Sequence, residues 1–152
     1  MRIVISYSIT DTGWRNHLRS FLAPLEDNRL VTELWDRGSL QAGANADAEA
    51  TAAFRRADLA LVLLSAQYLA DKVLIQQDLL HLLNERHRRS LILIPIVLSP
   101  CLWESVPALS GLTVIPADRS SLSQAQSVET ALHQVATEIS VQALRWHRAQ
   151  LP

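Results

Sequence analysis

The chain has 152 residues, 49% of them apolar, and its 14 basic and 15 acidic residues give a formal net charge of −1. That length is typical of one domain, and the apolar share is enough for a hydrophobic core without disulfides or metals. The near-neutral charge gives no general attraction to nucleic acid or to anionic lipid, so neither kind of partner is expected.

The chain has one cysteine, Cys101, and no set of Cys and His spaced as metal ligands, so we expect a reducing compartment and no metal site. The apolar run that starts at Ile3 is broken at Tyr7-Ser8, which is too short for a signal peptide or a spanning helix. We therefore predict a cytoplasmic protein with one domain over residues 1–152. Whether this domain is the N-terminal module of a longer protein stays open.

Short apolar runs alternate with stretches of helical periodicity, a pattern typical of a parallel sheet with helices on both faces. In chain order, the sequence predicts a strand over 2–6, a helix over 11–25, a strand over 30–35, a loop over 36–43, a helix over 44–57, a strand over 58–65, a helix over 72–88, strands over 91–98 and 112–116, and a long helix from 123 onward. The 58–65 run is almost wholly apolar and does not alternate, as in a central strand buried on both faces. Pro95 places the 91–98 strand at an edge or near a bulge, because proline cannot donate to a ladder.

This order predicts a flavodoxin-like, doubly wound α/β fold with five parallel strands in the order 2-1-3-4-5 and helices on both faces. Ligands of such sheets bind at the carboxyl ends of the strands, so we expect a site in the loops after Ser6, Trp35 and Ser65. A phosphate-receiver domain shares the sheet order. It is excluded because no paired acidic residues follow the first strand and no aspartate ends the 58–65 strand.

The residues at these strand ends have both structural and ligand-binding interpretations. Ser6, Tyr7 and Ser8 end the first strand, where the crevice favours ligand contact over a simple turn. The Trp35 ring either anchors the sheet edge or stacks on a base. Ser65 lacks a G-x-S-x-G nucleophile elbow, so we predict a helix cap.

The loop after Trp35 and the helix over 72–88 carry further candidates. Asp36 and Arg37 either contact each other as loop charges or contact a ligand, and Gly43 is expected to adopt a positive φ. Asp78, taken alone, fits a solvated position on an amphipathic helix. Glu85 is expected in a surface ion pair.

Four segments together carry a resemblance to a known family. They are Ile3-Val4-Ile5-Ser6-Tyr7-Ser8 followed by Asp11 and Trp14, then Trp35-Asp36-Arg37 with Leu40 and Gly43, then residues 57–65 followed by Tyr68-Leu69, and finally Pro95 with Pro100-Cys101-Leu102-Trp103. In order and spacing they resemble the Toll/interleukin receptor (TIR) family in its bacterial form. The second segment is similar to the family's BB loop.

The resemblance implies two functions that occur on one fold. Many bacterial members cleave NAD at the nicotinamide–ribose bond, and others act as self-associating signalling modules. The enzymatic members carry a glutamate about thirteen residues after the serine that matches Ser65, which in this chain is Asp78. A carboxylate there stabilises the oxocarbenium-like ribose that forms as nicotinamide leaves.

The resemblance thus makes Asp78 the catalytic candidate, with NAD as substrate, no cofactor, and other TIR domains as partners. The binding candidates are Ser6, Tyr7, Ser8, Trp35, Asp36, Arg37, Gly43 and Ser65. Aspartate is one methylene shorter than glutamate, and a displacement of about 1 Å can cost about 100-fold in rate. The family's proline and tryptophan beside the loop glycine are replaced by Ala42 and Ala46. Two hypotheses stay open: a defence or signalling module that self-associates and cleaves NAD, and a catalytically inactive TIR scaffold that only mediates protein–protein interaction.

Overall fold

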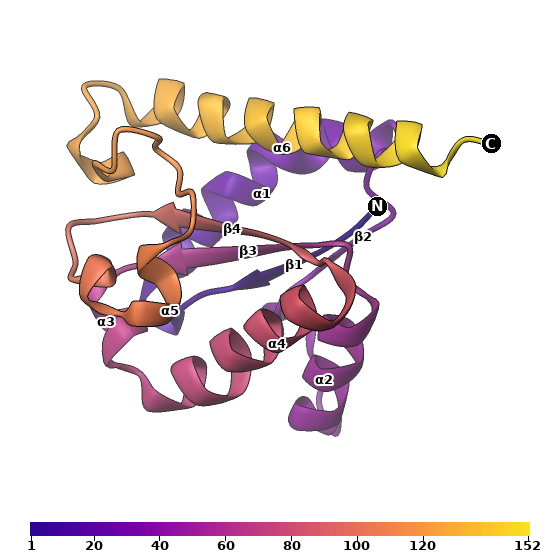
Figure 1. Cartoon of the computed structure of the whole chain (residues 1–152), viewed down its shortest axis with the longest axis horizontal. Coiled ribbons are helices and arrows are strands. Elements are labelled where there is room, and N and C mark those ends of the chain that lie inside the picture. The colour runs from indigo at the N-terminus through magenta and orange to yellow at the C-terminus, as the bar shows by residue number, and fades with distance from the viewer.

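The computed structural model describes residues 1–152 and contains one parallel sheet in the order β2-β1-β3-β4. Its strands are β1 (Arg2–Ser6), β2 (Glu33–Trp35), β3 (Leu59–Leu64) and β4 (Ile92–Val97). Figure 1 shows the sheet at the centre of the molecule with helices above and below it. The predicted α/β class, the parallel strands and the order of the first four are confirmed.

Two helices cover each face of the sheet, with α1 and α6 on one side and α2 and α4 on the other (Figure 1). The helices are α1 (Thr12–Asp27), α2 (Ala46–Arg56), α3 (Ala66–Ala70), α4 (Leu80–Arg89), α5 (Pro107–Ser110) and α6 (Val128–Gln150). Shorter turns are the 3-10 helices η1 (Ile9–Asp11), η2 (Arg37–Ser39), η4 (Trp103–Ser105) and η5 (Leu122–Gln124), and the π-helix η3 (Leu74–Leu79). None of these helices combines the length and the apolar character needed to cross a membrane.

The hydrophobic core has two halves, one on each side of the sheet. Ile3 and Ile5 of β1 point toward α1 and α6, whereas Val4 between them points toward α2 and α4. Every residue of β3 is fully buried because helices cover both of its faces. This explains the unbroken apolar run Leu59–Leu64, and the prediction of a central strand is confirmed.

A fifth strand over 112–116 is not formed, and the structure corrects this prediction. Ile115 makes a single parallel bridge to Ile96: the Val97 N–H donates to the Ile115 carbonyl at 2.9 Å, and the Ile115 N–H donates to the Pro95 carbonyl at 3.0 Å. The next bond of a parallel ladder would run from the N–H of residue 95 to the carbonyl of Thr113, and proline has no N–H. Pro95 thus ends the pairing, as its expected edge position implies.

The predicted helix over 72–88 is two elements, the π-helix η3 and the α-helix α4. The junction is marked by the Leu80 N–H, which donates to the carbonyl of Ile75, five residues earlier. The helix ends in the basic run Arg86–Arg89, and Ser90 follows with a φ of 60°. Asp11 directly precedes α1, and its side chain makes no capping hydrogen bond there.

Truncation of a central core side chain tests this architecture. We expect Leu61→Ala, in fully buried β3, to lower the free energy of unfolding by about 2–5 kcal/mol, because it removes apolar contacts and leaves a cavity. Urea unfolding followed by circular dichroism measures the change. Leu102→Ala is the matched control, since Leu102 is 80% exposed, and an equal loss in both variants would contradict the assignment of β3 to the core.

Candidate functional site

The carboxyl ends of β1 and β3 bring three polar side chains together beneath the surface. Ser6, the last residue of β1, donates from its Oγ to the Oδ2 of Asp78 at 3.0 Å and lies 2.9 Å from the Tyr68 hydroxyl. A serine has one hydroxyl proton, so the Tyr68 hydroxyl donates to Ser6. Burial raises the pKa of Tyr68, and the hydrogen bond with Ser6 offsets this only in part, so Tyr68 stays a neutral donor. The result is a directed chain of hydrogen bonds from Tyr68 through Ser6 to Asp78.

Asp78 is only 2% exposed, so the interpretation as a solvated helix position is wrong. The π-helix is the local reason, because each π turn inserts an extra residue and turns the following side chains to a new direction. Gln76 and Gln77 face solvent, while Asp78 and Leu79 face inward. Single π turns of this kind are frequent at functional sites.

Arg37 supplies the counter-charge of Asp78. Its Nη2 donates to Oδ1 at 2.7 Å and its Nε lies 3.4 Å from Oδ2, the geometry of a two-pronged ion pair. The hydrogen bond to Asp78 raises the pKa of the Arg37 guanidinium above its ordinary value, so the group remains a cation. Both oxygens of Asp78 are thus occupied by Arg37 and Ser6.

Asp36 is fully buried and has different partners. Arg19 of α1 donates to its Oδ2 at 2.8 Å, the Arg15 Nε lies 3.7 Å from the same oxygen, and the Gly38 N–H donates to Oδ1 at 2.7 Å. Mutual contact of Asp36 and Arg37 was the wrong interpretation. The backbone of Asp36 is extended, with φ −148° and ψ 173°, so successive side chains point to opposite sides.

The position of Gly38 leaves no room for a side chain, because the side chains of Arg15 and Asp36 fill the space around it. A Cβ there would lie 2.3 Å from the Arg15 Nη2 and 2.8 Å from the Asp36 Oδ1. The same Arg15 donates to the Tyr7 hydroxyl at 3.1 and 3.2 Å. Gly43 lies further along the exposed loop, outside this cluster, and its φ of +85° confirms the predicted positive angle.

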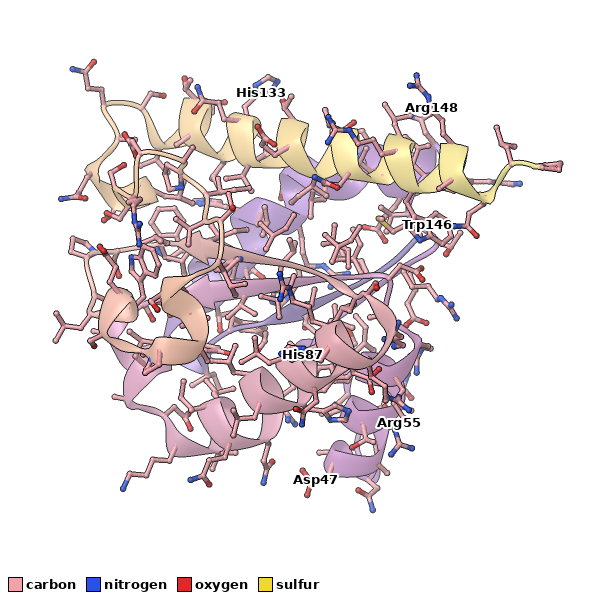
Figure 2. The ribbon with its side chains drawn as sticks, in the orientation of Figure 1. Asp47, Arg55, His87, His133, Trp146 and Arg148 are labelled. Atoms are coloured by element: carbon pink, nitrogen blue, oxygen red, sulfur yellow. The ribbon has the colours of Figure 1, made fainter.

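Two cavities open on either side of Arg37. The first, of about 530 Å³, is lined by Tyr7, Ile9, Thr12, Arg15, Arg37, Gly38, Asp71, Val73 and Leu74. The second, of about 550 Å³, is lined by Arg37, Asp47, Ala50, Thr51, Phe54, Gln76, Gln77, Leu80, His81 and Asn84. Figure 2 shows Asp47 at the outer end of α2, on the rim of this second cavity. Asp78 lines neither cavity, because Arg37 stands in between.

The remaining candidates have structural roles. Trp35 is 8% exposed and its ring meets Phe54 edge-on, with 6.0 Å between the ring centroids, so it packs in the core. The Ser65 Oγ accepts from the Tyr68 N–H at 3.1 Å and donates to Asp11, which confirms the predicted helix cap. Ser8 caps η1 by accepting from the Thr10 N–H at 3.4 Å. Of the predicted binding residues, only Tyr7 and Arg37 line either of these two cavities.

Sequence reasoning missed three contributors to the site, Arg15, Arg19 and Tyr68. It also missed the burial of Glu85, which lies on α4 outside both cavities. The two arginines lie four residues apart on one face of α1, which was the available signal. Glu85 does pair as expected, with Arg88 and Arg89, but it is 3% exposed. Burial alone would raise the pKa of the Glu85 carboxyl, and the hydrogen bonds from Arg89 and Arg88 outweigh it, so the pKa lies below its ordinary value.

Removal of the Asp36 carboxylate tests whether it anchors the loop. We expect Asp36→Ala to lower the free energy of unfolding by about 2–3 kcal/mol, somewhat less than for a wholly buried pair, because Arg15 and Arg19 can still reach water. Urea unfolding measures the loss. Asp27→Ala, at the exposed end of α1, should change stability by less than about 0.5 kcal/mol, and a similarly small effect of Asp36→Ala would contradict an anchoring role.

Comparison with known proteins agrees with this geometry. Residues 3–135 match the family model of the TIR domain. An uncharacterized protein of Sinorhizobium fredii, y4lF, is 27% identical over 137 residues, which covers 90% of this chain and 42% of that protein. The chain thus spans less than half the length of this relative. With a family match over nearly all of the sheet and its helices, the chain belongs to the TIR-domain family.

Proposed function

We propose that this TIR domain is a cytoplasmic module of a defence or signalling protein, that it associates with other TIR domains, and that it cleaves NAD at the nicotinamide–ribose bond with Asp78 as the essential carboxylate. The observation that supports this most is the placement of Asp78. It is a buried carboxylate on a π turn, at the carboxyl edge of a parallel sheet, with cavities on both sides of its arginine partner.

The chemistry needs a negative charge beside the ribose. As the bond between C1′ and nicotinamide breaks, its electron pair leaves with nicotinamide and positive charge develops on C1′ and the ring oxygen. A fixed carboxylate stabilises that charge. Water then adds to C1′ and loses a proton, giving ADP-ribose, or a nucleophilic atom of the same molecule adds and gives a cyclic product.

The surroundings of Asp78 suit this role. The hydrogen bond from Ser6, itself held by Tyr68, fixes the direction of the carboxylate. Each neighbouring cavity, at about 530 and 550 Å³, lies within the range of about 300–1,000 Å³ common for small-molecule sites. A nucleotide would therefore have room next to the carboxylate once Arg37 moves aside.

Asp78 substitutions test the catalytic proposal. We expect Asp78→Ala to abolish NAD loss and Asp78→Glu to preserve or raise it, because the charge is retained and only the reach changes by one methylene. NAD consumption is followed with product identification, at several protein concentrations and with a crowding agent, since TIR domains that act across subunits are silent when dilute. Asp27→Ala, which removes an exposed carboxylate at the end of α1 that lines neither cavity, is the control for general damage.

Each result has a distinct meaning. Cleavage lost only in Asp78→Ala supports the enzyme. Activity that appears only in Asp78→Glu means that the aspartate is too short and that the chain is not an active enzyme. Silence from all variants at every concentration rejects the catalytic part of the proposal.

One observation favours a second function, a catalytically inactive scaffold. Both oxygens of Asp78 are engaged and no buried side-chain nitrogen or oxygen lacks a hydrogen-bond partner, so the network is complete without a ligand. Asp78 would then be a structural charge that ties η3 to the loop, and association would be the whole function.

Loop changes test association in either case. We expect Leu40→Ala to weaken self-association about tenfold, because Leu40 is half-buried in the loop over 36–45 and helps to hold the shape that a partner would contact. Sedimentation velocity over a concentration series measures this. Leu102→Ala is the control on the exposed surface elsewhere, and unchanged association in Leu40→Ala would exclude this loop from the interface.

A further inference from the structure

The ion pair of Arg37 and Asp78 closes the carboxylate off from any ligand. Arg37 takes Oδ1 at 2.7 Å and lies 3.4 Å from Oδ2, while Ser6 holds Oδ2 at 3.0 Å. Asp78 is 2% exposed, yet the Arg37 side chain is 29% exposed and faces both cavities. The arginine is therefore the part of the pair that a ligand meets first.

The cavity beside Tyr7 is lined by two cations and one anion, Arg15, Arg37 and Asp71. Arg15 shares the buried carboxylate of Asp36 with Arg19, so two cations divide one anion behind the wall. The Asp71 Oδ1 accepts from the N–H groups of Val73 and Leu74, which hold this carboxylate at the start of η3. A wall with two arginines to one aspartate favours an anionic ligand.

The backbone at Arg37 is held while its side chain is free to turn. The preceding residue, Asp36, is buried and fixed by Arg19 and by the Gly38 N–H. The salt bridge to Asp78 is the one that Arg37 makes. A rotation of this side chain alone would move the guanidinium from Asp78 into the cavity without unfolding the loop.

We propose that Arg37 is an exchangeable latch: it covers Asp78 in the free domain and transfers to a phosphate group of a ligand in the cavity beside Tyr7, which uncovers the carboxylate. The inference rests on the proposed role of Asp78 as the carboxylate of the site. A phosphate suits the exchange because it offers a guanidinium the same two-pronged pairing as a carboxylate. A neutral ligand offers Arg37 no replacement for Asp78 and leaves the latch closed.

The test measures binding of ADP-ribose, which has the phosphates but no nicotinamide bond to break, by calorimetry at fixed salt. We expect Asp78→Asn to bind ADP-ribose about tenfold more tightly than the parent, because a latch closed about nine-tenths of the time reduces the apparent affinity by that factor. Arg37→Gln should bind it about 10- to 100-fold more weakly, because the charge-assisted bonds to phosphate are lost. A residue that merely touches the ligand would not strengthen binding when replaced.

Matched variants separate the latch from general electrostatics. Asp71→Asn also removes a negative charge from the cavity wall, but it frees no arginine, so its gain should be much smaller than that of Asp78→Asn. Arg55→Gln removes an exposed charge on α2 (labelled in Figure 2) that lines neither cavity, and should leave the affinity unchanged. Equal gains in Asp71→Asn and Asp78→Asn would overturn the latch.

Nuclear magnetic resonance reports the exchange itself. On titration with ADP-ribose or with inorganic pyrophosphate, the Arg37 Nε and the Asp78 carboxyl carbon should shift together, whereas adenosine should shift neither. Movement of Arg37 alone, or no movement of either signal at saturating ligand, would overturn the proposal. None of these measurements depends on NAD cleavage. A domain that cleaves no NAD can therefore still show the exchange of Arg37, and a domain that cleaves NAD can still lack it.

Discussion

A carboxylate removed from water costs several kcal/mol unless a cation meets it, and this requirement organises the carboxyl end of the sheet. Asp36 and Asp78 are both buried there. Each recruits an arginine from a different part of the chain, Arg19 from α1 and Arg37 from the η2 turn. The loop after β2 is consequently held to α1 by the ion pair of Asp36 and Arg19 and to η3 by the ion pair of Arg37 and Asp78. The candidate site lies between these two ion pairs.

Most of the fold follows from patterns that a sequence displays directly. The unbroken apolar run Leu59–Leu64 is typical of a strand covered on both faces, and its neighbours follow from alternation of strands and helices. The predicted fifth strand does not form because a ladder needs N–H donors on both strands, and Pro95 has no N–H to donate from β4. The π turn at η3 could not be predicted from the sequence, because apolar residues spaced three or four apart do not show to which carbonyl each N–H donates.

The residues of the candidate site were predictable in part, whereas the ion pairs among them were not. Ser6 is a candidate because it ends a strand, and Asp78 is one through the resemblance to the TIR family; the fold brings the two within hydrogen-bond distance. Which charges pair could not be read from adjacency, since Asp36 and Arg37 are neighbours in sequence whose side chains diverge on an extended backbone. The spacing of Arg15 and Arg19 places both on one face of α1, but it does not tell which carboxylate from another element they meet.

The same geometry links the two proposed activities. Arg37 and Leu40 belong to one turn, closed by the bond from the Leu40 N–H to the Arg37 carbonyl at 3.2 Å. A partner that contacts Leu40 therefore acts on the same turn that carries the guanidinium over Asp78. Ser6 and Tyr68 lie on β1 and α3, outside the turn, and keep the carboxylate in place when the guanidinium leaves it. Under the proposed function, assembly and ligand binding then act on one ion pair, and a domain with neither partner nor ligand keeps its Asp78 covered.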